Sequence, residues 1–414
     1  MTPETSRRRI LVFGAGNIGR SFVGQVFGRN GYGVVFADVD RPLVEALRRD
    51  GRYDVVHRYP DGTEERLTIT GITAVDSSTD SSDDTGSESA ALHRHLAEVD
   101  LVATSVGAAV LPRLLPQLTE EALRRAQTGE GPFDLILAEN IHGAGDMVRA
   151  AFTAGFTQAE RAERYDGTTP EGALPGVIEC SVGKMVPIIS AAQRQNEPTT
   201  VWAEGFNTLL VDADGWSGDI PDIPQLRPVR PIGAWVDRKL YIHNLGHAAC
   251  AYLGHRGFTY IWEAIGDKAI HTAVRRVMDA AAEGLRREYP GVFAPADLDD
   301  HIDDLLYRFS SRSLGDTVFR VGRDLKRKLG PEDRVVGALR LLQKHGLDTT
   351  PVEEVYRAAL HFRAVDESGR PFPSDREFLD ALEAADDPAT FIAETSGFRL
   401  PEERSLVERL LPGR

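Results

Sequence analysis

The feature that most constrains the fold is a glycine-rich run, Gly14-Ala-Gly-Asn-Ile-Gly19, near the start of the chain. It follows the short apolar segment Arg9–Phe13, which is typical of a buried strand, and it opens a helical pattern. In that context the first glycine permits a tight turn and the second lets the backbone approach a pyrophosphate. The third lets helix and strand pack closely. The run therefore predicts a dinucleotide site.

An acid stands where such a site uses one. Asp38 closes the next apolar run, Val34–Ala37, nineteen residues after Gly19. A carboxylate there can accept hydrogen bonds from a ribose diol, and it would repel a 2′-phosphate. The sequence therefore predicts NAD as the cofactor in preference to NADP.

The first half of the chain alternates strand and helix signals, which predicts an α/β Rossmann-type domain with a doubly wound parallel sheet. Two segments around Pro60-Asp-Gly62 indicate a hairpin, and the polar stretch Asp76–Ser89 indicates a solvated loop. The expected strands, beyond the first two, are Tyr53–Val56 and Arg66–Thr70 in the hairpin, Asp100–Thr104, Asp134–Ala138, and later strands near 177–181 and 199–211 that extend the sheet.

The second half reads as mainly α-helical. It begins after a loop, 216–231, that carries four prolines. We therefore expect an NAD-binding domain over 1–214 and a helical substrate and catalytic domain over 215–414. The expected helices are 262–289, 298–309, 331–345, 351–363, 375–385 and 401–411.

Composition narrows the class of protein. The formal net charge of −15 argues against a nucleic-acid binder, whose footprint is a clustered basic surface. Cys180 and Cys250 form neither a disulfide framework nor a zinc spacing. The polar, basic start predicts no signal peptide, and no run predicts a membrane span. We expect a cytoplasmic monomer or homodimer that acts on a small molecule.

A second motif carries the chemistry. Lys239, Asn244 and His247 fall within one short stretch, and on a regular helix they share an arc of about 140°. An amine, a carboxamide and an imidazole supply a proton acceptor, a dipole donor and an orienting group. No His and acid spacing around them indicates a metal site. The motif suggests a metal-free dehydrogenase that oxidises an alcohol with a lysine as base.

Phe13–Phe22 resembles the amino-terminal signature of mannitol-1-phosphate 5-dehydrogenases, which belong to the mannitol dehydrogenase family of polyol-specific long-chain dehydrogenases. Asp237–Gly254, with its Lys-x4-Asn-x2-His core, is similar to the active-site helix of that family. The likeness runs from about residue 9 to 350, and its further matches are Thr104–Gly107, Glu139-Asn140 and Arg320–Lys328.

The resemblance implies roles for individual residues. Lys239 would be the general base, Asn244 and Asn140 would donate to the developing oxygen anion, and His247 would bind a substrate hydroxyl. Arg320 and Lys328 would contact the substrate. The residues implied to surround NAD are Gly14, Ala15, Gly16, Asn17, Ile18, Gly19, Asp38, Ser105, Val106 and Gly107.

The leading substrate pair is D-mannitol 1-phosphate and D-fructose 6-phosphate. Related enzymes usually carry an Asp-Arg pair where this chain has Gly183-Lys184, and His243 replaces a common aliphatic residue. These departures leave two alternatives open. One is the same chemistry on a non-phosphorylated polyol, a cyclitol or a specialised-metabolite sugar. The other is an NAD-binding sensor without turnover.

Overall fold

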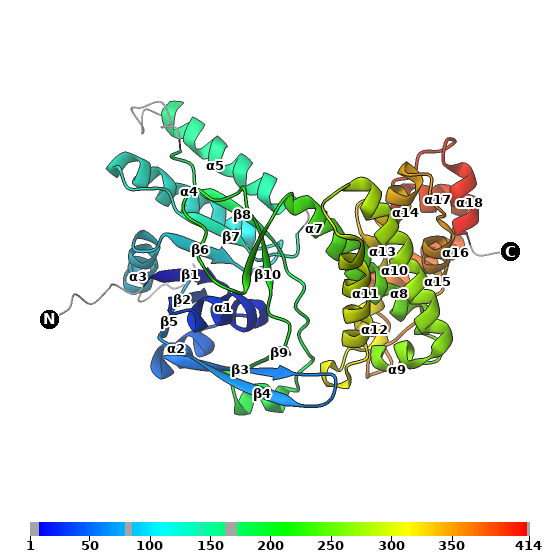
Figure 1. Ribbon diagram of the computed structural model, residues 1–414, viewed down its shortest axis with the longest axis horizontal. Helices are drawn as coiled ribbons and strands as arrows, with labels where there is room; N and C mark the ends of the chain where they lie inside the picture. Colours follow the sequence, from blue (N-terminus) through cyan, green and yellow to red (C-terminus); the bar gives the residue numbers. More distant parts are fainter. Residues whose placement is uncertain (1–7, 79–84, 142, 162–171, 412–414) are drawn as a thin grey trace. The chain divides into compact units, whose positions relative to one another are not determined.

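The computed structural model describes residues 8–78, 85–141, 143–161 and 172–411. It divides into two compact units. The first comprises Met1–Tyr59 with Thr63–Ile232, and the second comprises Pro60–Gly62 with Gly233–Arg414. Figure 1 shows strands and helices in the first and helices in the second.

The first unit is built on an eight-stranded sheet in the order β11-β10-β8-β7-β6-β1-β2-β5. Its pairs are parallel except β10 against β8. This confirms the predicted Rossmann-type fold. The strands are β1 (Arg9–Phe13), β2 (Gly33–Asp38), β5 (Ile72–Asp76), β6 (Leu101–Thr104), β7 (Asp134–Leu137), β8 (Gly176–Ser181), β10 (Leu209–Asp212) and β11 (Leu226–Val229).

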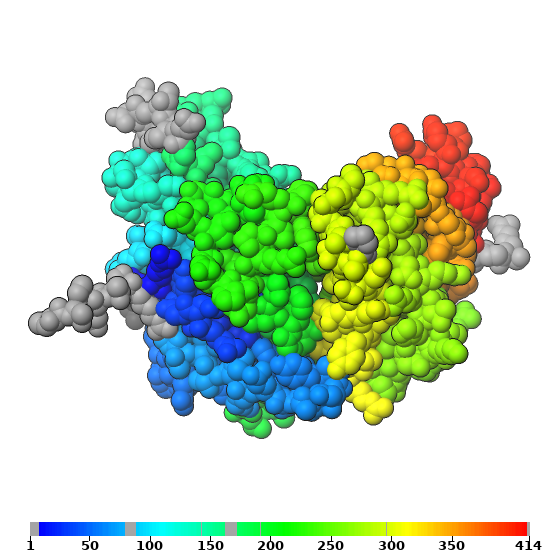
Figure 2. All heavy atoms as spheres, viewed as in Figure 1, coloured from blue at the N-terminus to red at the C-terminus, as the bar shows by residue number. Residues whose placement is uncertain are grey.

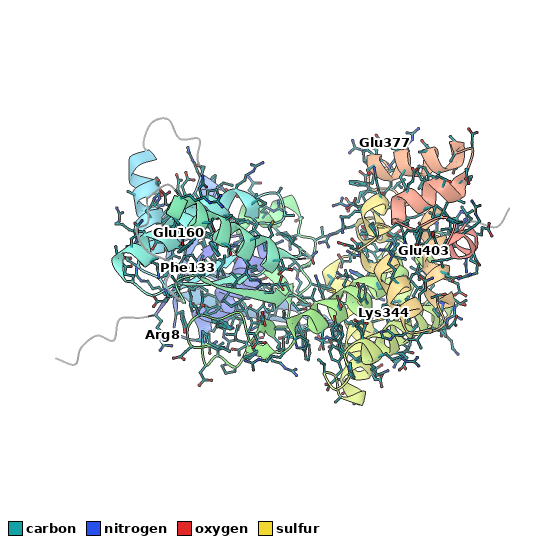
Figure 3. The ribbon with its side chains drawn as sticks, turned by 90° about the horizontal axis from the view of Figure 1, so that it is seen from above. Arg8, Phe133, Glu160, Lys344, Glu377 and Glu403 are labelled. Carbon is teal, nitrogen blue, oxygen red and sulfur yellow. The ribbon has the colours of Figure 1, made fainter. Side chains whose placement is uncertain are left out.

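The two faces of the sheet carry separate apolar cores, because side chains alternate along each strand. Ile10 and Val12 of β1 face a core that includes α1 and α2, whereas Leu11 and Phe13 face one that includes α3, α4 and α5. Figure 3 places Phe133 inside this unit, where it is fully buried. The covering helices are α1 (Gln25–Arg29), α2 (Arg41–Asp50), α3 (Thr85–Ala97), α4 (Leu111–Thr128) and α5 (Ala144–Arg161), and α6 (Ala191–Asn196) is a further helix of the unit.

A smaller sheet confirms the predicted hairpin. β3 (Arg52–Arg58) and β4 (Glu64–Thr70) are antiparallel, with Tyr53 opposite Ile69. β9 (Val201–Glu204) pairs with the other edge of β3 in parallel. Figures 1 and 2 show the blue hairpin beside the green residues of the later strands. The expectation that all of 199–211 extends the main sheet is therefore wrong for β9, because its partner is β3.

Two other segments differ from expectation. The predicted loop Asp76–Ser89 is too long, since α3 already begins at Thr85; residues 79–84 lie outside the described part of the chain. Residues 215–232 group with the first unit, because β11 pairs with β10 inside the stretch expected to be a proline-rich loop. The boundary at 214/215 stays a prediction for independently folding domains.

The second unit is helical, as predicted, but it contains more and shorter helices than the pattern indicated. Asp267 caps α10 and separates it from α9, so the single helix expected over 262–289 is two. The elements are α7 (Ile232–Arg238), the π-helical segment η2 (Lys239–Asn244), α8 (Leu245–Gly254), α9 (Ile261–Gly266), α10 (Lys268–Glu288), α11 (Pro295–Phe309), the 3-10 turn η3 (Arg312–Leu314), α12 (Val318–Gly322), α13 (Leu325–Lys328), α14 (Arg334–Lys344), α15 (Thr350–Leu360), α16 (Pro373–Ala384), α17 (Pro388–Ser396) and α18 (Arg404–Leu410).

Among the described helices, none combines the length and the apolar character that a membrane crossing requires.

Candidate active site

The glycine loop of the first unit has the backbone that a bound pyrophosphate needs. Gly14 has a φ of +94°, and a Cβ at Gly19 would lie 1.9 Å from the Gly14 carbonyl oxygen. Both positions therefore require glycine. A Cβ at Gly16 would meet nothing within 4 Å, so the backbone there is open to a ligand. The loop leads into a π-helical turn, η1 (Gly19–Gly24), and then α1.

Asp38 lies at the carboxyl end of β2 and touches this loop. Its Oδ2 accepts a hydrogen bond of 2.5 Å from the Ala15 amide, and its Oδ1 accepts one of 3.0 Å from the Asp40 amide. The carboxylate is partly exposed. The predicted acid and the predicted loop are therefore adjacent, and the residues present fit a dinucleotide with a free ribose diol.

The segment Ser105–Gly107 follows β6 and packs beside the same loop. Ser105 donates from Oγ to the Gly14 carbonyl at 3.1 Å. Buried Glu139 accepts hydrogen bonds from the Val106 and Gly107 amides at 2.9 and 2.8 Å. This carboxylate fixes the loop from behind. The family resemblance matched Glu139-Asn140 as a pair. The structure shows that the glutamate binds the Val106 and Gly107 amides.

Asn140 lies just beyond β7, at the carboxyl edge of the sheet, and it is exposed. Lys184 belongs to the same unit and is buried. Its Nζ lies 3.4 Å from Oε1 of Gln25 and 5.4 Å from the centre of the Phe22 ring. The Lys184 cation is thus held against the helix that follows the glycine loop. Gly183 leaves no side chain beside it.

Lys239, Asn244 and His247 lie on one continuous helical run through α7, η2 and α8. η2 begins at Lys239 and ends at Asn244. A π-turn holds about one residue more than an α-turn, so it rotates by roughly 80° per residue. With this geometry the three residues share an arc of about 60°, narrower than the roughly 140° of a regular helix. The π-segment therefore brings the three functional groups onto one stripe.

Lys239 is partly buried, and its surroundings favour the neutral amine. Burial, followed by the nearby Arg334 guanidinium, lowers the pKa of Lys239 to about 8, against an opposing effect of Asp333. Asp333 caps α14 and accepts from Nε of Arg334 at 2.7 Å. Arg334 also reaches the Asn244 carbonyl at 3.5 Å. A lysine with such a pKa can accept a proton near neutral pH.

His247 stacks on Phe309, with ring centres 4.8 Å apart and an interplanar angle of 11°. Burial, followed by Lys328 and Arg334, lowers the pKa of His247 to about 3. His243 is buried beside it, with ring centres 6.4 Å apart, and burial with Arg308 lowers the pKa of His243 well below its usual range. Both imidazoles are therefore neutral near neutral pH.

The two predicted substrate cations differ in their environment. Arg320 is half-exposed and pairs with Asp316. Lys328 is buried and donates from Nζ to the carbonyls of Val321 and Arg323, each at 2.6 Å. Burial, followed by Arg334, lowers the pKa of Lys328 to about 7. Lys328 thus caps the carboxyl end of α12. Any substrate contact of Lys328 uses the ammonium N–H that does not bond these two carbonyls.

Sequence reasoning missed three residues of this cluster. Arg334 lowers and Asp333 raises the pKa of Lys239. In the sequence, the only indication of these two residues was an acid near the start of a predicted helix. Asp316 lies four residues before Arg320, a spacing that suits an ion pair, and it also approaches His247. None of these carries a motif by itself. Their tertiary contacts give them their roles.

Comparison with known proteins gives a match in each unit. Residues 8–225 match the mannitol dehydrogenase Rossmann domain, and residues 231–411 match the mannitol dehydrogenase C-terminal domain. The chain belongs to the mannitol dehydrogenase family.

One relative supports the family assignment, and two solved structures share the fold. A mannitol-1-phosphate 5-dehydrogenase of Bacillus licheniformis is 32% identical over 358 residues, which cover 86% of this chain and 88% of that protein. The fold is similar to a D-sorbitol dehydrogenase in substrate-free form, with a TM-score of 0.74, 18% identity, and coverage of 97% of this chain and 91% of that one. It is also similar to the Pseudomonas fluorescens mannitol 2-dehydrogenase ternary complex with NAD and D-mannitol, with a TM-score of 0.73, 18% identity, and coverage of 98% and 91%.

The predicted family, the fold class and an NAD-dependent dehydrogenase of the polyol class are thereby confirmed. The roles of individual residues, the boundary at 214/215, the absence of a metal and the choice between monomer and homodimer stay predictions.

Proposed function

We propose that the protein interconverts a polyol phosphate and its ketose with NAD, and that the pair is D-mannitol 1-phosphate and D-fructose 6-phosphate. The Bacillus licheniformis relative supports the phosphorylated substrate by its name and by 32% identity over most of both chains. The glycine loop and Asp38 support NAD, since they form an open backbone with an acid beside it.

The observation that carries the proposal is Lys239. The residue begins a π-helical turn and is partly buried. Its amine lies near Arg334 and has a pKa of about 8. NAD, held by the glycine loop and Asp38, would supply the hydride acceptor for the carbinol carbon. Lys239 takes the hydroxyl proton, so that the C–O bond becomes a carbonyl. In the reverse direction the ammonium form returns that proton.

Two amides assist this transfer in our proposal. Asn244 lies on the same stripe as Lys239, and Asn140 lies at the carboxyl edge of the sheet. Each carries an NH₂ group that can donate to the oxygen as negative charge develops on it. His247, neutral because of burial and the surrounding cations, binds a second hydroxyl and orients the chain of the polyol.

The phosphate is assigned to the cationic segment Arg320–Lys328. Arg320 is half-exposed, and Lys328 retains one N–H beyond its two carbonyl contacts. Arg323 and Lys326 provide further charge nearby. A dianion bound there would be sensitive to salt, because screened cations attract it less.

The test is a screen of mannitol 1-phosphate, other polyol phosphates, free polyols and cyclitols with NAD, followed as NADH absorbance. The expected result is a clear preference for mannitol 1-phosphate, with a Michaelis constant that rises with ionic strength. Equal use of mannitol and mannitol 1-phosphate would remove the phosphate role of Arg320–Lys328. If the protein binds NAD but turns over no compound of the panel, the alternative of an NAD-binding sensor is favoured.

One observation favours the alternative polyol. This chain has Gly183-Lys184 where related enzymes usually carry an Asp-Arg pair. The Lys184 amine lies against Gln25 and Phe22 inside the first unit. The missing carboxylate removes a partner for substrate hydroxyls. A non-phosphorylated polyol, a cyclitol or another sugar is therefore the second candidate, with the same lysine chemistry.

A further inference from the structure

Asp316 is a buried carboxylate that touches two predicted substrate residues at once. It lies just before α12, with 7% of its surface exposed. Its Oδ1 accepts a hydrogen bond from Nη1 of Arg320. Its Oδ2 lies 3.5 Å from Nε2 of His247. The two oxygens thus face two different partners.

The imidazole of His247 is neutral at this place. The charges of Arg308 of α11, Arg320 of α12, Lys328 of α13 and Arg334 of α14 add to burial in disfavouring a positive charge on the ring. His243, on the preceding turn, is neutral too. Asp316 places a carboxylate oxygen beside the ring. A neutral imidazole has one N–H and one lone pair, so the tautomer decides which nitrogen donates.

The carboxylate lies beside one of the two ring nitrogens of His247. Oδ2 of Asp316 can only accept, so a lone pair on Nε2 would lie 3.5 Å from negative charge, whereas an N–H there would have an acceptor at that distance. The Phe309 ring, stacked on the imidazole, holds the plane of the ring. Within the described part of the chain, no residue forms a hydrogen bond with Nδ1 of His247.

We propose that Asp316 is a positioning residue that holds His247 in the Nε2–H tautomer, so that Nδ1 accepts a hydrogen bond from a substrate hydroxyl. This deepens the proposed function and rests on it for the substrate. It makes His247 an acceptor beside the donor amide of Asn244. A polyol that places a hydroxyl hydrogen at Nδ1 fits, and a carbonyl oxygen at the same place does not.

Asparagine at position 316 would invert the arrangement. Arg320 has only donors, so the carboxamide would turn its oxygen toward the guanidinium. The NH₂ group would then face Nε2 of His247, which becomes the acceptor and passes its proton to Nδ1. The Asp316→Ala variant, in contrast, removes the partner and lets both tautomers form. The two variants therefore differ in outcome although both remove the same charge.

The experiment measures the tautomer directly. The full-length protein is labelled with ¹⁵N at histidine, and the His247 signals are assigned by their loss in His247→Asn. Long-range ¹H–¹⁵N spectra show which ring nitrogen carries the proton. The same samples give kcat/KM for the best polyol and the dissociation constant of NAD. Asp303→Asn is the matched control, because Asp303 also pairs with an arginine, Arg275, on the surface of the same unit.

The expected result is a proton on Nε2 in wild type and in Asp303→Asn, on Nδ1 in Asp316→Asn, and a mixture in Asp316→Ala. In Asp316→Asn, kcat/KM should fall about tenfold to a hundredfold, as for a hydrogen bond left unmade, while NAD binding is unchanged. A proton on Nδ1, or on both nitrogens, in wild type overturns the proposal, whether or not the variants fold. If no polyol is turned over, the proposed function fails, and the tautomer still decides the role of Asp316.

Discussion

At the scale of single residues, Asp38 combines an expected contact with the cofactor and an observed contact with the glycine loop. It is the acid expected to bind the ribose diol, and it also accepts from the Ala15 amide of the glycine loop. Removing the carboxylate therefore removes the repulsion toward a 2′-phosphate and frees a backbone N–H near the same place.

We predict that Asp38→Ala narrows the preference for NAD over NADP by lowering kcat/KM with NAD and raising it with NADP. The measurement is steady-state kinetics with both cofactors at saturating substrate. Asp40→Ala is the control, since Asp40 lies two residues away and caps α2. Equal efficiency of the unmodified enzyme with both cofactors would contradict the assignment.

Lys239 carries the second residue-scale prediction. General-base catalysis is typically worth about a hundredfold to ten-thousandfold, so Lys239→Ala should lose at least about two orders of magnitude in turnover. NAD affinity should change little, because the glycine loop and Asp38 belong to the other unit. In wild type the oxidation rate should rise with pH around 8, as the ammonium loses its proton. A variant that folds, binds NAD and keeps near-normal turnover would show that the base lies elsewhere.

At the scale of elements, the sequence predicted most reliably where a requirement is local. The glycine loop, the strand before it and Asp38 were all predictable, since a tight turn and a close helix need glycine at fixed places. β11 was not, because Pro228 and its neighbours indicate a loop, and only pairing with β10 makes them a strand. The stripe of Lys239, Asn244 and His247 was predicted on a regular helix. A π-segment has no sequence signal in that pattern, so the closer alignment emerged only from the structure.

α14 gives a prediction at this scale, because its first turn delivers Arg334 to the neighbourhood of Lys239. Arg334 lowers the pKa of Lys239, so Arg334→Met should raise that pKa and move the inflection of the pH–rate profile upward by up to about one pH unit. Arg340→Met on the same helix is the control, since Arg340 bonds the Gly397 carbonyl instead. The profile of oxidation between pH 6 and 10 is the measurement. An inflection that stays in place would mean that burial alone sets the pKa.

At the scale of the whole molecule, two partly or fully buried lysines link stability to pH. The pKa values are about 8 for Lys239 and about 7 for Lys328 in the folded chain, against an ordinary 10.5. Between the folded and the ordinary values, the unfolded chain holds protons that the folded chain lacks. The free energy of unfolding therefore rises with pH in that window, by at most about 1.4 kcal/mol per pH unit for each lysine.

We predict that urea unfolding of the helical unit shows a smaller rise in stability from pH 7.5 to 9.5 in Lys239→Met and in Lys328→Met than in wild type. Cys250 of α8 has a raised pKa because it is buried, and it opposes the rise equally in all variants. Lys344→Met, at the exposed end of α14 (Figure 3), is the control. Parallel curves for all four proteins would mean that the two amines are protonated in the folded state.

Arg20 gives the glycine loop a mechanical connection to the smaller sheet. Its buried guanidinium donates to the carbonyls of Ala15 and Thr199, each at 2.6 Å, and its own carbonyl accepts from the Tyr53 hydroxyl at 2.8 Å. The side chain of Arg20 thus joins the cofactor loop to the approach to β9, and its backbone carbonyl joins the same residue to β3. Local openings of these segments should be thermodynamically coupled. Saturating NAD should therefore slow amide hydrogen exchange in β3 and β9 as well as in the loop. Arg20→Met should lose the slowing in β9, whereas β3 keeps its contact through the Tyr53 hydroxyl.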